Sequence, residues 1–179
     1  MSSPRSSRGN PAVGDIIRTM VVFGALILAL YGLGQLFTSK PETTVKTVDY
    51  AAVVAQARPA ATFPLASPTQ LPDGWRATSA RFQANGWHLG ILTDDDDYVG
   101  LEQLTATVDR AVDRFADGSK LGDPAEVAGE TWTVRTGPDG RITYVRNADG
   151  LTTLVNSTAP RSVVEDFIES LDYSTPAAG

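Results

Sequence analysis

The stretch from Trp75 to Leu104, WRATSARFQANGWHLGILTDDDDYVGLEQL, decides the fold class of this chain. Asn85-Gly86 separates the runs WRATSARFQ and WHLGIL, and this dipeptide between two strand-like runs is a strong short-range signal for a β-hairpin. An aspartate-rich turn then leads into YVGLEQL as a third strand. Every second residue of the middle run is apolar, which places these side chains on one face of a strand. They are Trp87, Leu89 and Ile91.

A second set of strand-like runs lies further along the chain: ETWTVRT, RITYVRN and LTTLVNST. The turns between them end in Asp139-Gly140 and Asp149-Gly150, and Asp-Gly readily supplies the positive φ that tight hairpins need. These runs predict a second three-stranded meander.

One amphipathic helix is expected after each meander, because apolar residues recur there at helical spacing. Pro160 suits the first turn of the second helix. The resulting order, βββαβββα, predicts an α+β domain with one antiparallel sheet and both helices packed on one face of it. The apolar stripe of the first helix consists of Val108, Ala111, Val112 and Phe115. That of the second consists of Val163, Val164, Phe167, Ile168 and Leu171.

An uncharged apolar run, TMVVFGALILALYGLGQLF, occupies residues 19–37. A spanning helix needs about 20 such residues, since each adds about 1.5 Å. We therefore expect a single transmembrane helix over residues 16–38. Basic residues set orientation, and three arginines precede the run, which predicts a cytoplasmic N-terminus and an extracytoplasmic C-terminal domain in the cell membrane. The alternative is a cleaved signal peptide, which typically has a shorter apolar region and a small-residue cleavage site.

Net charge is distributed unevenly along the chain. The whole chain carries a net charge of −6, residues 1–40 contain four Lys or Arg and one Asp, and the remainder therefore carries −9. An acidic exterior domain argues against nucleic acid as a partner. The chain has no cysteine, which excludes disulfides and thiolate metal sites.

The predicted organisation has five parts. A disordered cytoplasmic tail covers residues 1–15, and the membrane span follows at 16–38. A linker with a short helix and a proline-rich extended segment covers 39–70. The extracytoplasmic α+β domain covers 71–173, and a disordered tail covers 174–179. Four prolines between residues 59 and 72 favour an extended path there, and we expect Phe63 and Leu65 to hold it along the domain.

Four short motifs are the most specific of the chain: PDGW at 72–75, WHLG at 87–90, YVGLEQ at 98–103 and GETW at 129–132. They resemble the actinobacterial family known as domain of unknown function 4245, and the resemblance covers nearly the whole chain. It implies a small, membrane-anchored exported protein with a single span and no assigned activity. It supplies no catalytic residues.

Four residues stand out as a speculative ligand or partner surface: Trp75, His88, Glu102 and Gln103. His88 is the only histidine and faces away from the apolar side of its strand. A residue of the next strand, Glu102 or Gln103, is expected near it, and a base paired with a carboxylate can transfer protons. A structural strand histidine is the alternative. Trp75, Trp87 and Trp132 could line a sugar or peptide surface, or could fill the core.

Other signals are weaker. The run Asp94–Asp97 could offer oxygen ligands to calcium, but it lacks EF-hand spacing and suits a solvated turn. The serines lack the sequence context of a nucleophile elbow. We therefore predict no catalytic, cofactor-binding or metal-binding residues, no cofactor, and an uncharacterised module that is not an enzyme.

The expected function is a single-pass membrane protein with an extracytoplasmic module that binds a protein or another component of the cell envelope. The alternative is a cell-envelope enzyme or small-ligand-binding domain that uses a pocket near His88 and Glu102. The expected partners are the membrane, through residues 16–38, and an envelope or membrane protein.

Overall fold

The computed structural model describes residues 20–24, 27–28 and 46–173. Residues 20–24 and 27–28 are helical. No helix in the described ranges is long and apolar enough to cross a membrane. Most of the expected span at 16–38, and both expected tails at 1–15 and 174–179, lie outside the described residues. The compact unit begins at Val45.

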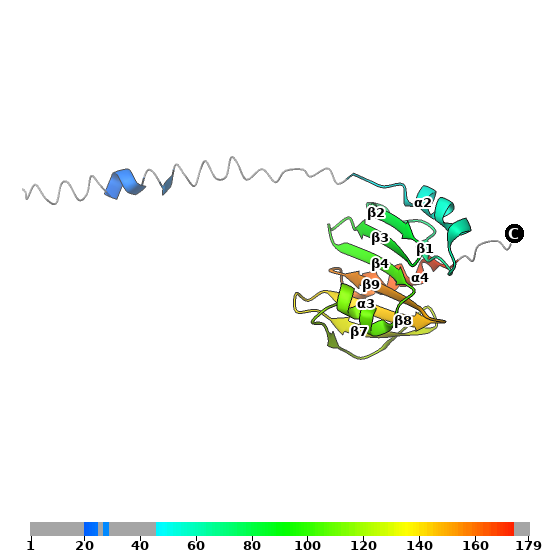
Figure 1. The fold of residues 1–179 in the computed structure, drawn as a ribbon. Coiled ribbons are helices and arrows are strands. Elements are labelled where there is room, and N and C mark those ends of the chain that lie inside the picture. Colours follow the sequence, from blue (N-terminus) through cyan, green and yellow to red (C-terminus); the bar gives the residue numbers. More distant parts are fainter. Residues whose placement is uncertain (1–19, 25–26, 29–45, 174–179) are drawn as a thin grey trace, which may run out of the picture. The chain divides into compact units, whose positions relative to one another are not determined.

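An antiparallel sheet forms the centre of this unit, with the strand order β2-β3-β4-β9-β8-β7-β5 (Figure 1). The two predicted meanders are confirmed, and they join through their third strands, β4 and β9. The first meander contains β2 (Arg76–Gln83), β3 (Gly86–Leu92) and β4 (Tyr98–Leu104). The second contains β7 (Glu130–Thr136), β8 (Ile142–Ala148) and β9 (Leu151–Ser157).

Shorter elements complete the unit, and the sequence did not predict the shortest strands. The helices are α2 (Tyr50–Ala57), the 3-10 turn η1 (Arg58–Ala60), α3 (Val108–Phe115) and α4 (Arg161–Glu169). The short strands are β1 (Ser67–Pro68), β5 (Lys120–Leu121), β6 (Ala125–Val127) and β10 (Leu171–Asp172). β1 pairs with β10, and β6 pairs with β7.

The residues of two hairpin loops can be compared with the turn residues that the sequence predicted. Asp149 and Gly150 both have positive φ, 52° and 81°, in a two-residue hairpin loop between β8 and β9. At the first hairpin the prediction is wrong by one residue. Gln83 pairs with Gly86, so Ala84 and Asn85 form the loop and Gly86 belongs to β3.

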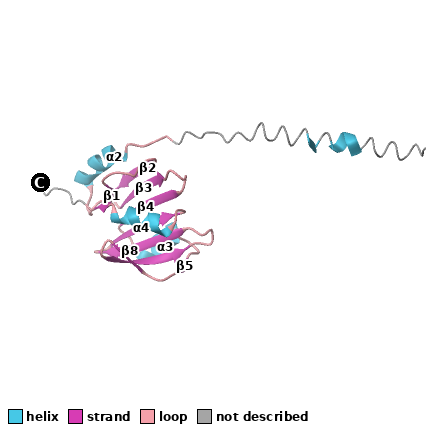
Figure 2. Ribbon diagram, turned by 180° about the vertical axis from the view of Figure 1, so that it is seen from behind, coloured by secondary structure: helices cyan, strands magenta, loops and turns pink. Residues whose placement is uncertain are grey.

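The helices that follow the two meanders, α3 and α4, lie on opposite faces of the sheet. The prediction that both pack on one face is therefore wrong. Alternate residues of β9 show this directly: Val155 packs in the cluster that contains Phe167 of α4, whereas Leu154 packs with Ala111 of α3. We call the two surfaces the α4 face and the α3 face. Figure 1 shows α3 in front of β8 and β9, and Figure 2, from behind, shows α4 on the near side.

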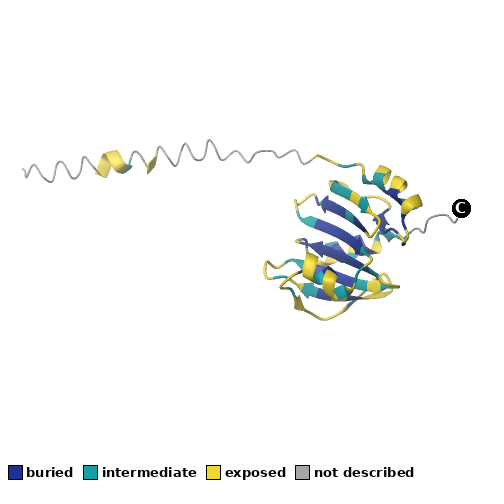
Figure 3. Cartoon of the chain, viewed as in Figure 1, coloured by how far each residue is buried: buried dark blue, intermediate teal, exposed yellow. Residues whose placement is uncertain are grey.

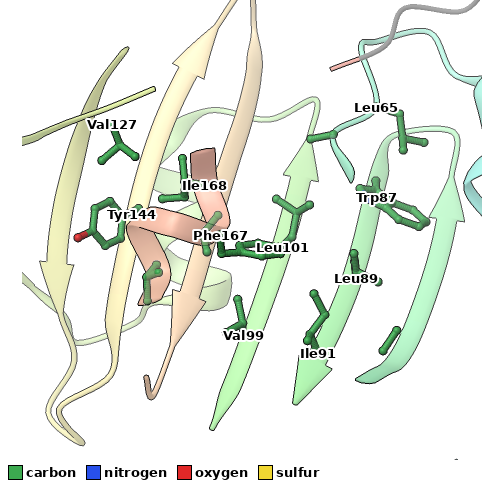
Figure 4. Packing of buried hydrophobic residues seen from close by; sticks show 14 of the residues in the cluster. Leu65, Trp87, Leu89, Ile91, Val99, Leu101, Val127, Tyr144, Phe167 and Ile168 are labelled. Carbon is green, nitrogen blue, oxygen red and sulfur yellow. The ribbon is translucent and has the colours of Figure 1, made fainter. Parts of the chain in front are cut away.

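The main core lies on the α4 face and draws on all parts of the unit (Figures 3 and 4). The expected linker at 39–70 contributes to it: Leu65 and Ala66 are fully buried, and α2 buries Val54. The side chain of Asp49 caps α2 by accepting a hydrogen bond from Ala52 N. From Val48 onward the chain is therefore part of the domain.

Candidate functional site

The α4 face holds two of the four predicted site residues, and both have structural contacts. Gln103 is fully buried, and its Oε1 accepts a hydrogen bond from Ala66 N at 2.8 Å. Its Nε2 donates to Pro64 O at 3.1 Å. Gln103 thus ties the extended segment to β4. Trp75 is half-buried and stacks on Phe167 of α4, with ring centroids 6.3 Å apart.

The other two predicted residues meet on the α3 face. His88 and Glu102 lie directly opposite each other on β3 and β4. His88 Nδ1 is 2.5 Å from Glu102 Oε1, and the exposed fractions of the two side chains are 17% and 7%. The sequence predicted that either Glu102 or Gln103 would lie near His88. In the structure this residue is Glu102, because Gln103 points to the other face of the sheet.

A third residue, which the sequence analysis did not place here, completes this group. Ser79 Oγ lies 2.7 Å from His88 Nε2. The pairing of β2 with β3 shifts by one residue between Ala77 and Ser79, which is a β-bulge. A bulge re-aims side chains, and the hydroxyls of Thr78 and Ser79 both lie close to the space above Gly90. No sequence motif marks this serine, so only the three-dimensional pairing reveals it.

A groove of about 480 Å³ adjoins His88 and Glu102 on the α3 face. Two arginines line it, Arg81 from β2 and Arg114 from the end of α3. The Arg114 guanidinium also lies over the Phe115 ring, 5.1 Å from its centroid. The groove therefore places two positive charges beside a buried carboxylate and an imidazole.

A second cavity, of about 620 Å³, lies on the α4 face. We call it the Trp132 pocket. It is bounded by the segment 62–64, by strands β6 to β9, by the end of α4 and by β10. Trp132 Nε1 is buried and has no hydrogen-bond partner among the described residues. Its principal apolar lining comes from Phe63, Val127, Trp132, Leu151, Ile168 and Leu171.

Polar groups gather along the same pocket. Arg146 Nη2 lies 2.8 Å from Glu130 Oε1. Tyr173 also lines the pocket, and burial raises the pKa of its phenol by more than the nearby Arg146 lowers it. The pocket thus combines an apolar wall with an ion pair and a neutral phenol.

The aspartate-rich turn at 94–97 has local partners. Arg76 Nη2 is 2.5 Å from Asp96 Oδ1, and Thr158 Oγ1 donates to Asp97 Oδ1 at 2.9 Å. Among the described residues no group of three or more His, Cys, Asp or Glu side chains is placed to hold a metal ion.

The fold and its two cavities define a small α+β domain with an antiparallel sheet covered on both faces. A family model described as a protein of unknown function (DUF4245) matches residues 8–171. This match spans most of the chain, and the chain therefore belongs to that family. A search of curated proteins gave no match.

Proposed function

We propose that this chain is a single-pass membrane protein whose extracytoplasmic domain binds a small lipid-like molecule of the cell envelope in the Trp132 pocket. The observation that carries the proposal is the cavity of about 620 Å³, whose wall is largely apolar and includes Trp132. Cavities of roughly 300–1,000 Å³ with apolar walls and few polar groups are typical of small-molecule sites.

The chemistry of the lining defines the ligand class. The apolar wall favours an aliphatic chain. Arg146 has further N–H donors beyond the one directed at Glu130, and these can hold the carboxylate or carbonyl oxygen of a polar head group. The expected ligand is a fatty acid or an acyl ester.

The apolar N-terminal run supports the membrane part of the proposal. The large apolar side chains between residues 20 and 28 that the structure describes are 60–73% exposed, which suits a lipid environment. Val48 N donates to Ala77 O at 2.9 Å, so the chain that follows the proposed span is fixed to the domain from this residue onward.

Topology can be tested cleanly because the chain has no cysteine. We expect the single-cysteine variant Asp95→Cys to react with a membrane-impermeant maleimide in intact cells. Ser3→Cys is the matched control and should react only after permeabilisation. The opposite pattern, or labelling of both, would contradict the proposed orientation.

Ligand binding can be measured by calorimetry on a fragment of residues 45–179, since the core lies within it. Affinity for fatty acids and their methyl esters should rise about fourfold per methylene, because each buried CH₂ contributes about 0.8 kcal/mol. Leu151→Arg places a charge in the pocket wall and should abolish binding. Leu121→Arg is the control, because Leu121 is 69% exposed and does not line the pocket. Equal binding by both variants would exclude this site.

A further inference from the structure

Three side chains on three adjacent strands form one hydrogen-bond chain on the α3 face. Ser79 of β2 contacts His88 Nε2, and His88 Nδ1 contacts Glu102 of β4, at 2.7 and 2.5 Å. A carboxylate only accepts hydrogen bonds, so with Glu102 as the acceptor the hydrogen of this contact lies on His88 Nδ1. In that tautomer Nε2 has a lone pair that accepts the hydroxyl hydrogen of Ser79.

The order of the hydroxyl, imidazole and carboxylate groups along these hydrogen bonds is that of an activated nucleophile. Such a site needs a hydroxyl within about 2.6–3.2 Å of a base, and a third group that orients the base. Glu102 can orient the imidazole of His88, because its side chain is only 7% exposed and has little freedom to move away. We propose that Ser79, His88 and Glu102 form a hydrolytic site for acyl esters, separate from the Trp132 pocket.

Two glycines leave room on the sheet surface for the side chains around the nucleophile. Gly90 and Gly100 pair directly across β3 and β4. A Cβ at Gly90 would lie 2.5 Å from Ser79 Oγ and 3.4 Å from His88 Nε2. The hydrogen bond between Ser79 and His88 therefore occupies space that any other residue at position 90 would take. The open space beside this group is the groove that His88 and Glu102 line, and an ester would have to approach from there.

The Tyr98 hydroxyl, a hydrogen-bond donor, lies over the second glycine. A Cβ at Gly100 would lie 2.7 Å from the Tyr98 hydroxyl. Burial and the nearby Glu102 carboxylate raise the pKa of Tyr98, so its phenol stays protonated at neutral pH. A phenol O–H can stabilise the negative charge that develops on the carbonyl oxygen during acyl transfer.

The adjoining groove indicates which esters fit. Arg81 and Arg114 line it, next to His88 and Glu102. Guanidinium groups bind carboxylates and phosphates with paired hydrogen bonds. The substrate class is therefore an acyl ester that carries an anionic group on its acyl or alcohol part.

The reaction is a balanced hydrolysis. Ser79 Oγ forms a bond to the ester carbonyl carbon, and its proton moves to His88 Nε2. The bond from that carbon to the alcohol oxygen then breaks, and His88 returns the proton to the departing alcohol. Water attacks the acyl-Ser79 ester and gives one proton to His88, which returns it to Ser79 Oγ as the acid leaves.

The test uses the full chain in detergent micelles and an alkyl fluorophosphonate, which forms a phosphonate ester with an activated serine and releases fluoride. Mass spectrometry should find the adduct on Ser79, in the tryptic peptide after Arg76. His88→Gln should slow labelling by at least about 100-fold, because general-base assistance is worth about 10²–10⁴. Ser119 is the internal control: Arg135 Nε donates to its Oγ at 2.8 Å, and it should stay unmodified.

Rates of ester hydrolysis by variants distinguish the roles of Arg114 and Glu102. Hydrolysis of a nitrophenyl ester with a succinyl group should exceed that of the butyryl ester, and Arg114→Gln should remove the preference. Glu102→Gln acts through His88 and should lower kcat with little change in KM. Leu121→Arg, at an exposed position outside both cavities, should leave both rates unchanged. Neither rate reports on ligand binding in the Trp132 pocket, so this proposal can fail independently of the proposed ligand binding.

Two results would overturn the proposal. One is a folded wild-type chain in which Ser79 stays unmodified under conditions that label a known serine hydrolase. The other is a Ser79→Ala variant that hydrolyses the succinyl ester at the wild-type rate. If Ser79→Ala is poorly folded, Ser79→Cys keeps a nucleophile at this position. Its thiol should react with iodoacetamide faster than that of Ser119→Cys, and an equal or slower rate would also reject the proposal.

Discussion

Gln103 shows at the residue scale how one polar side chain can hold a segment without regular structure. Its amide satisfies the backbone of residues 64 and 66, in a region that is otherwise apolar. From the sequence it was a candidate for a ligand surface, because a polar residue in an apolar strand is unusual. Its place on the α4 face makes it structural instead.

Gln103→Leu should destabilise the domain by about 1–3 kcal/mol, because it leaves the buried Ala66 N–H without an acceptor. The measurement is urea unfolding of the fragment 45–179. Gln83→Leu is the matched control, since Gln83 is exposed at the end of β2 and should change stability by less than about 0.5 kcal/mol. Similar effects of both substitutions would show that the amide hydrogen bonds do not stabilise the segment.

Tyr144 connects β8 to α4 and predicts a dependence of stability on alkaline pH. Its hydroxyl donates to Glu165 Oε1 at 2.6 Å. Burial, and then the bond to Glu165, raise the pKa of Tyr144 to about 12, above the value of about 10 expected in the unfolded chain. Its neutral form is thus favoured by folding, and the resulting stability is complete below pH 10 and lost as pH rises towards 12.

Tyr144→Phe should therefore cost about 0.5–1.5 kcal/mol at pH 8, and the difference from wild type should shrink between pH 10 and 12. Urea unfolding at several pH values measures it. A difference that stays constant across this range would contradict the assigned pKa shift.

At the scale of elements, the opposite placement of α3 and α4 has a clear cause. β9 is buried on both faces over most of its length, and β8 is buried on both faces at residues 143–145. Such strands lack the alternation of polar and apolar residues that marks a solvent-facing side. The apolar stripe of α3 is confirmed, and so is that of α4 from Val163 to Ile168, whereas Leu171 lies in β10 and not in the helix. No polar face remained on these strands to show which side of the sheet each helix covers.

The contact of α3 with the sheet gives a prediction at this scale. Ala111 is 1% exposed and packs against Val145 and Leu154. Ala111→Leu should destabilise the domain by about 1–3 kcal/mol through overpacking. Ala52→Leu, on the exposed side of α2, makes the same chemical change and should have little effect. Thermal unfolding measures both, and equal melting temperatures would contradict close packing of α3.

At the scale of the whole molecule, the segment before β2 is part of the domain. Phe63 packs against Phe82 with ring centroids 6.3 Å apart, and Leu65 is fully buried. Burial of one such side chain contributes about 1.5–3 kcal/mol, and a typical domain is stable by only about 5–15 kcal/mol.

Removal of residues 45–70 should therefore abolish cooperative unfolding, whereas the fragment 45–179 should unfold in one transition. Near-ultraviolet circular dichroism during heating compares the two fragments. A cooperative transition in the fragment 71–179 would show that the first segment is dispensable. This result would also bear on the Trp132 pocket, because residues 62–64 form part of its wall.

The sequence by itself determined the order of the main strands and helices, most hairpin turns, the acidic charge of the domain and its family motifs. These are local properties that depend on residue periodicity, turn chemistry and composition. The tertiary structure decided the faces that α3 and α4 cover, the separation of Gln103 from His88, and the contact of Ser79 with His88. Each of these depends on strand register, and a single β-bulge in β2 changes which side chains share a face.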